Sequence, residues 1–371
     1  MEQKTISADN HYRKVDQWIS DNSVKTLMLV CDTSLPFLKV KEYFDELNSR
    51  IKVVRFDDFQ PNPLYESVVK GVELYRREGC SAIIAVGGGS AIDVAKCIKA
   101  YCKMEGDGED GGFLKQEIQP NDIPFLAMPT TAGTGSEATR YAVIYFDGKK
   151  QSVTSESFIP EAVLMDPDCL KTLPLYQKKA TMCDALCHAI ESFWSVNSTE
   201  ESRKYSKAAI QGVIKNMDGY LNNSEEGLKG MLLAANTAGK AINITQTTAG
   251  HAMCYKVTSL FGVAHGHAAI LCDRVLFPWM VLHTDGCIDP RGEEHIRKIL
   301  DEIGQALGCE DAKNGAAKLG EVFNKLELSI PKPTEAQYEE MKTSVNPDRL
   351  KNHPIKLDEK TIDRLYHEIL R

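Results

Sequence analysis

Hydrophobic residues in the first half of the chain come in short runs that alternate with segments of helical spacing. The runs are rich in Val, Ile, Leu and Phe and are bounded by Gly, Pro or Asp, which is typical of buried strands. Residues 39–49 and 63–78 have the apolar spacing of helices. This alternation predicts βαβ units and a mostly parallel sheet. The expected strands are residues 26–31, 51–56, 82–86, 124–128 and 141–146.

The pattern changes at residues 166–175, where DPDCLKTLPL carries two prolines and several turn residues. Long helical patterns follow over residues 179–196, 202–221 and 226–243, and charged amphipathic helices continue over residues 291–371. A length of 371 residues suits two domains. We therefore expect an α/β domain over residues 1–172 and an all-helical domain over residues 173–371.

Composition and charge exclude several classes of protein. The formal net charge is -8, and no basic run or aromatic-interleaved Lys/Arg cluster is present, which argues against a nucleic-acid partner. Residues 1–20 are polar and charged, and no stretch approaches the roughly 18 apolar residues that span a bilayer. The 11 cysteines are scattered without CxxC pairs, which favours reduced, buried thiols. These features predict a cytoplasmic protein without a membrane partner.

A glycine-rich loop follows the expected strand at residues 82–86. Gly87, Gly88, Gly89 and Ser90 separate this strand from a helix that we expect to open at Ala91. Glycines bring backbone amides close to a ligand, and a helix N-terminus favours negative charge, so a pyrophosphate is the natural ligand. The alternative is a tight turn that uses glycines for geometry only.

A second loop of small residues, MPTTAGTGSEATR, follows the next strand and supplies the hydroxyls of Thr130, Thr131 and Thr139. Such groups at the carboxyl ends of parallel strands hold nucleotides in α/β proteins, although a solvent-exposed turn is the alternative. Asp32 ends the first strand, where a carboxylate binds ribose hydroxyls and repels the 2′-phosphate of NADP, favouring NAD. A helix N-cap would explain Asp32 equally well.

An aspartate and three histidines stand out in the second half. Asp184 and His188 are four residues apart on an expected helix, and His251, His265 and His267 lie among small and apolar residues. Asp184 with His188, His251 and His265 would offer one carboxylate and three imidazoles, a set suited to Zn²⁺ or Fe²⁺. Taken singly, each histidine is better explained as a hydrogen-bonded core residue.

The chain resembles the iron-containing (group III) alcohol dehydrogenases, relatives of glycerol dehydrogenase and dehydroquinate synthase. Six motifs in this order carry the resemblance: CDTSL, PNP, GGGSAIDVAK, PTTAGTGSEAT, DALCHAIES and HAMCYKVTSLFGVAHGH. The resemblance implies a Rossmann-like dinucleotide-binding α/β domain, an all-helical domain and an active site between them. It implies one divalent metal, Fe²⁺ or Zn²⁺, on Asp184, His188, His251 and His265, and a homodimer or larger homo-oligomer. The implied NAD(H) contacts are Asp32, Asn62, Gly88, Gly89, Ser90, Asp93, Thr130, Thr131, Thr139 and Lys150.

One position departs from the family pattern. Many members carry a further histidine where this chain has Tyr255. A phenol, with a reference pKa of about 10, transfers protons poorly at neutral pH. We therefore expect proton transfer through water, the cofactor ribose or His267.

The resemblance implies a metal-dependent, NAD(H)-linked dehydrogenase that interconverts a small aldehyde and its primary alcohol. Segments over residues 135–160 and 173–207 are similar to a branch that acts on short aldehydes with a strong anion, notably phosphonoacetaldehyde and, by analogy, sulfoacetaldehyde. Arg140 and His267 are the candidates for binding that anion. The alternatives are a general short-chain, lactaldehyde- or butanol-type dehydrogenase, a dehydroquinate-synthase-like lyase, and a non-catalytic NAD-binding protein.

Overall fold

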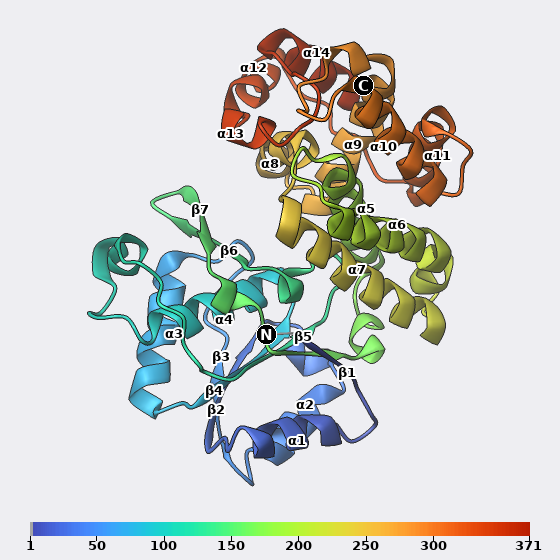
Figure 1. Ribbon diagram of the computed structural model, residues 1–371. Helices are drawn as coiled ribbons and strands as arrows, with labels where there is room; N and C mark the ends of the chain where they lie inside the picture. The colour runs from blue at the N-terminus through green and yellow to red at the C-terminus, as the bar shows by residue number, and fades with distance from the viewer. Residues whose placement is uncertain (1–2) are drawn as a thin grey trace. The chain divides into compact units, whose positions relative to one another are not determined.

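A six-stranded parallel sheet forms the centre of the first of two structural units (Figure 1). The computed structural model describes residues 3–371; the first unit ends at Leu173 and the second starts at Pro174 and also includes Ala132–Thr134. Every neighbouring pair in the strand order β1-β8-β5-β4-β2-β3 is parallel. The strands are β1 (Lys4–Ser7), β2 (Thr26–Cys31), β3 (Lys52–Phe56), β4 (Ala82–Gly87), β5 (Phe125–Pro129) and β8 (Ala162–Met165).

Helices cover both faces of this sheet. Alternate residues of β2 enter two different hydrophobic cores: Met28 packs with residues of α3 and α4, and Leu27 packs with residues of α1 and α2. Because both faces are buried, the inner strands are almost continuously apolar, which made them visible in the sequence. The helices of this unit are α1 (Arg13–Asp21), α2 (Val40–Leu47), α3 (Tyr65–Glu78) and α4 (Gly89–Tyr101).

The expected strand at residues 141–146 forms, but it lies outside the parallel sheet. It is β6 (Tyr141–Phe146), which pairs antiparallel with β7 (Lys149–Thr154). Asp147 and Gly148 connect the two strands with positive φ angles of 54° and 69°, and two such residues are typical of a tight hairpin turn. Strands β1, β7 and β8 were not expected, since they are short or polar.

The second unit is built of helices, and α5 packs against α6, α7 and α9. The expected combination of an α/β unit with a helical unit is therefore confirmed. Within residues 3–371, no helix combines the length and apolar character required to cross a membrane. The helices are α5 (Leu175–Trp194), α6 (Glu200–Leu221), α7 (Glu225–Thr245), α8 (Ala249–Phe261), α9 (His265–Leu282), α10 (Glu293–Ala306), α11 (Ala312–Leu326), α12 (Glu335–Ser344), α13 (Pro347–Leu350) and α14 (Glu359–Ile369).

Candidate metal centre and nucleotide loops

Three of the four expected metal ligands come together in the helical unit. Asp184 and His188 lie one turn apart on α5, and His251 lies in the first turn of α8. Their ligand atoms are all within 4.8 Å of one another. His251 Nε2 is 3.4 Å and His188 Nε2 is 4.0 Å from Asp184 Oδ1. All three side chains are buried, so the cluster is shielded from bulk water.

This donor set fits a divalent transition metal. Ligand atoms around a tetrahedral ion with bonds of about 2.0–2.2 Å are about 3.3–3.6 Å apart; the separation of 3.4 Å falls in this range, and that of 4.0 Å is slightly longer. A carboxylate oxygen with imidazole nitrogens suits Zn²⁺ or Fe²⁺ better than Mg²⁺ or Ca²⁺. Asp184, His188 and His251 are therefore the residues that would hold such an ion.

His265, the fourth expected ligand, opens α9 beside this group. Its ring centroid is 5.2 Å from that of His251, with the two planes at 64°. Its Nδ1 lies 3.6 Å from the Cys254 sulfur. His265 is thus adjacent to the three donors but is not one of the group within 4.8 Å, and its role as a ligand stays a prediction.

Glu191, which the sequence interpretation missed, orients His251. This fully buried carboxylate accepts hydrogen bonds from the amide of His251 at 3.0 Å and from the amide and hydroxyl of Thr248 at 2.6 and 2.7 Å. It also contacts His251 Nδ1. Because Glu191 holds a proton on Nδ1, Nε2 is the nitrogen that would bind a metal, by exchanging its own proton for the ion. Glu191 lies about one helical turn after His188, and this spacing could have identified it from the sequence.

The ionisable groups of the cluster influence one another strongly. Burial alone would lower the pKa of His251, but Glu191 and Asp184 outweigh it and raise this pKa to about 10. Burial opposes ionisation of Asp184, but His188, His251 and His265 hold its pKa well below the usual range. Burial lowers the pKa of His188 to about 4, so its ring is neutral at pH 7. The carboxylates of Asp184 and Glu191 thus favour binding of a positive charge within this cluster.

Glu191→Gln is expected to weaken metal binding by about 10–100-fold. Four N–H or O–H donors from Thr248 and His251 point at the Glu191 carboxylate, and an amide would turn an NH₂ group toward some of them. Competition with a chromophoric chelator measures the affinity. Glu200→Gln, which alters an exposed ion pair on α6, is the control and should leave the affinity unchanged. Equal affinities for both variants would contradict the role of Glu191.

In the α/β unit, the glycine loop connects β4 directly to α4. The helix begins at Gly89, two residues earlier than expected, with Gly88 as its N-cap. The Gly88 amide donates to Asp32 Oδ2 at 3.0 Å. A Cβ on Gly87 would lie 2.5 Å from the Ala91 Cβ, so the chain needs glycine there. Asp32 Oδ1 accepts from the amide of Ser34 at 2.9 Å, so Asp32 ties β2 to the glycine loop.

The threonine loop lies beside the glycine loop. The Thr130 amide donates to the carbonyl of Gly87 at 3.0 Å, because β4 and β5 are neighbours in the sheet. Asp93 on α4 accepts from the Ser136 hydroxyl at 2.5 Å. Buried Lys96, which was not expected, donates to the Ser136 carbonyl at 2.6 Å and to the Thr139 hydroxyl at 3.2 Å. The strand ends therefore gather Asp32, Gly88, Gly89, Ser90, Thr130 and Thr131, a favourable place for a dinucleotide.

Two further expected cofactor contacts lie near the β6–β7 hairpin. Lys150 on β7 is paired with Tyr145 on β6. The Tyr145 amide donates to the carbonyl of Pro63 at 2.8 Å, next to Asn62. Asn62 has a positive φ of 58°, which is uncommon outside glycine. The hairpin thus brings two residues 88 positions apart in sequence into one neighbourhood.

The three expected catalytic or substrate-binding residues have different surroundings. Arg140 forms an ion pair with Glu156 at 2.6 Å. The two ring nitrogens of His267 lie 3.0 Å from the Tyr176 hydroxyl and 2.8 Å from the Ser329 carbonyl. Tyr255 stacks on His265 with a centroid distance of 5.2 Å. Tyr255 therefore contacts a residue that is expected to bind the metal.

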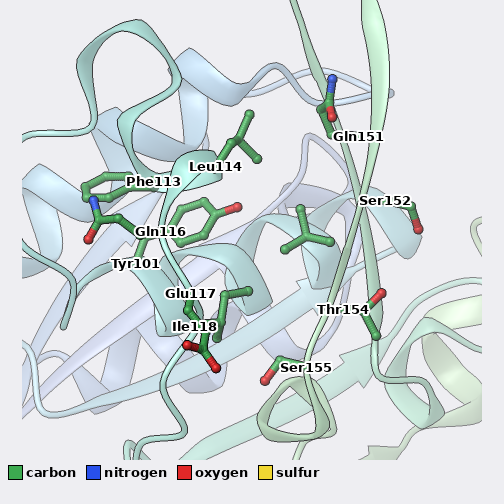
Figure 2. A pocket seen from close by; sticks show the side chains of 11 residues that line it. Tyr101, Phe113, Leu114, Gln116, Glu117, Ile118, Gln151, Ser152, Thr154 and Ser155 are labelled. Atoms are coloured by element: carbon green, nitrogen blue, oxygen red, sulfur yellow. The ribbon is translucent and has the colours of Figure 1, made fainter.

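A pocket of about 510 Å³ lies elsewhere in the α/β unit (Figure 2). It is lined by Tyr101 and Phe113, whose rings stack 5.1 Å apart, and by residues 151–155. None of the expected site residues lines it. We assign it no part in the proposed reaction.

Family descriptions match both units. Residues 3–167 match the iron-containing alcohol dehydrogenases, and residues 178–369 match the C-terminal part of the Fe-containing alcohol dehydrogenase family. The chain belongs to the iron-containing alcohol dehydrogenase family. This membership confirms the expected enzyme class, and the gathered carboxylate and imidazole donors agree with the metal expected in it.

Individual members of the family show the range of the similarity. A phosphonoacetaldehyde reductase of Streptomyces viridochromogenes is 29% identical over 77% of this chain and 75% of its own length. A 1,3-propanediol dehydrogenase of Citrobacter freundii is 32% identical over 78% of this chain and 75% of its own. A crystal structure of sulfoacetaldehyde reductase from Bifidobacterium kashiwanohense in complex with NAD⁺ has the same fold, with a TM-score of 0.87 and 24% identity over 99% of this chain and 97% of that one.

Proposed function

We propose that this iron-type dehydrogenase is a metal-dependent, NAD(H)-linked reductase of a two-carbon aldehyde with an anionic head group, phosphonoacetaldehyde or sulfoacetaldehyde. The observation that carries the reaction type is the buried group of Asp184, His188 and His251, oriented by Glu191. The similarity to a phosphonoacetaldehyde reductase and the fold shared with a sulfoacetaldehyde reductase bound to NAD⁺ support the substrate class and the cofactor. We also propose a homodimer or larger homo-oligomer.

Each part of the chain has a defined task in this proposal. Asp184, His188 and His251, with His265 as the fourth ligand, would hold the ion, which when bound supplies Lewis-acid polarisation of the substrate oxygen. The glycine and threonine loops would hold the dinucleotide, which supplies the hydride. Glu191 keeps a proton on His251 Nδ1, so that Nε2 is the nitrogen that would exchange its proton for the ion.

Tyr255 takes little part in proton transfer in this scheme. Burial raises the pKa of its phenol above the ordinary value, and the neighbouring Arg349 guanidinium opposes that rise only in part. The hydroxyl therefore keeps its proton at neutral pH. Water, the cofactor ribose or His267 remains the expected route for the proton.

Steady-state reduction of phosphonoacetaldehyde, sulfoacetaldehyde and acetaldehyde by NADH, followed at 340 nm, tests the proposal. We expect kcat/KM to be at least about 10-fold higher for one of the anionic aldehydes than for acetaldehyde, because a charge-assisted hydrogen bond is worth about 1.5–3 kcal/mol. Reduction of butanal, an aldehyde without a charged group, serves as a further reference. Equal efficiencies on all of them would indicate a general short-chain dehydrogenase and remove the anionic head group from the proposal.

A further inference from the structure

Arg349 places a positive charge next to the metal-binding helices. Its Nη1 donates to the Tyr255 hydroxyl at 3.0 Å, and its guanidinium carbon is 4.9 Å from the centroid of the Tyr255 ring. Tyr255 in turn stacks on His265, and His265 lies edge-on against His251. A continuous series of side-chain contacts therefore connects the guanidinium to the metal donors.

This guanidinium has no carboxylate partner among residues 3–371, because no Asp or Glu oxygen lies within 4.0 Å of it. The neighbouring cations differ: Lys351 pairs with Asp348 at 2.6 Å and Lys256 pairs with Glu340 at 2.6 Å. Arg349 is also half-buried. A partly buried cation without an internal counter-charge favours binding of an external anion.

The short helix that carries Arg349 is held firmly in place. The Asn352 side chain donates to the carbonyl of Thr247 at 3.3 Å, and its backbone carbonyl accepts from the Val196 amide at 3.0 Å. The Asn346 side chain caps α13 through the amide of Asp348 at 2.9 Å. Because these bonds join α13 to the end of α5 and the start of α8, little ordering is needed when a ligand meets Arg349.

We propose that Arg349 is the anion-binding residue of the substrate site, with Tyr255 positioning its guanidinium. The planar fork of the guanidinium matches a tetrahedral phosphonate or sulfonate, and four of its five N–H groups are not used by Tyr255. The aldehyde end of the same molecule would reach toward the metal donors. This inference rests on the proposed aldehyde reductase function, and it assigns the head group to Arg349 in place of Arg140 and His267.

Replacement of Arg349 by glutamine, with lysine as the conservative variant, tests this assignment. For Arg349→Gln we expect kcat/KM on the preferred anionic aldehyde to fall about 30–100-fold, mainly through KM, and kcat/KM on butanal to change less than about threefold. Arg349→Lys should restore part of the loss. Lys351→Gln removes a positive charge from an exposed side chain two residues away and should match the wild type. Equal losses on butanal and the anionic aldehyde, or no loss on either, would overturn the assignment.

A binding measurement separates this inference from the proposed function. Calorimetric titration of the metal-loaded enzyme with methylphosphonate and with methanesulfonate should give binding that weakens at least about 10-fold in Arg349→Gln. If the enzyme reduced no aldehyde, the proposed function would fail, and loss of methylphosphonate or methanesulfonate binding in the variant would still support the subsite. Failure of the wild type to bind either anion would overturn the subsite even if reduction of aldehydes were observed.

Discussion

Replacement of His251 by alanine is expected to remove the metal and to lower kcat by about 1,000-fold or more, since the Lewis-acid contribution of a metal amounts to several kcal/mol. His251 Nε2 is 3.4 Å from Asp184 Oδ1, while its other ring nitrogen contacts Glu191. Elemental analysis of metal per chain and NADH oxidation with the preferred aldehyde measure the two effects.

Two companion variants make this result interpretable. His251→Ala leaves Glu191 without its imidazole partner, which adds a folding cost of about 1–3 kcal/mol. His188→Ala leaves the contact between Glu191 and His251 in place and removes an imidazole 4.0 Å from Asp184, so it should lose metal with a smaller loss of stability. His283→Ala is the control: His283 follows the far end of α9, which has 18 residues and is about 27 Å long. Retained metal in His251→Ala, or full activity of the wild type after exhaustive chelation, would contradict the metal site.

The sequence predicted the fold best where burial is uniform. Strand β2 has the expected bounds, residues 26–31, because residues on both of its faces enter a hydrophobic core. Strand β1, KTIS, is polar and mostly exposed, so no hydrophobic pattern marks it. Its pairing with β8, more than 150 residues later, depends on tertiary contacts that local patterns do not encode.

In the site too, the sequence predicted contacts within one helix and missed contacts between distant segments. The spacing of Asp184 and His188 on α5 was readable because helical geometry fixes which residues share a face. Glu191 lies on the same face of α5, so the same spacing could have placed it in the predicted site. Arg349 could not have been found in this way, because its contact with Tyr255 spans 94 residues and depends on α13 packing against α8. The bond between Asp32 and Gly88 likewise follows from the strand order, in which β2 and β4 are neighbours.

Gly266→Ala is expected to lower the free energy of unfolding by about 3 kcal/mol and to reduce the metal content. Gly266 is the second residue of α9 and lies against α5. A Cβ at this position would lie 2.1 Å from the carbonyl oxygen of Ala180, 2.5 Å from the Asp184 Cβ and 2.7 Å from the Asp184 amide nitrogen. Two of these atoms are backbone, so a rotamer change cannot relieve the overlap, and α9 must move away from α5.

That movement would separate His265, the preceding residue, from Asp184 and the other donors. Loss of stability and loss of metal should therefore occur together in Gly266→Ala, measured by scanning calorimetry and elemental analysis. Gly320→Ala on α11 is the matched control: a Cβ there meets no atom within 4 Å, so it should stabilise the helix by about 0.5–1 kcal/mol and leave the metal unchanged. A Gly266→Ala protein with wild-type stability and metal content would show that α5 and α9 can separate without cost, which would remove close helix packing as the reason why the donors stay together.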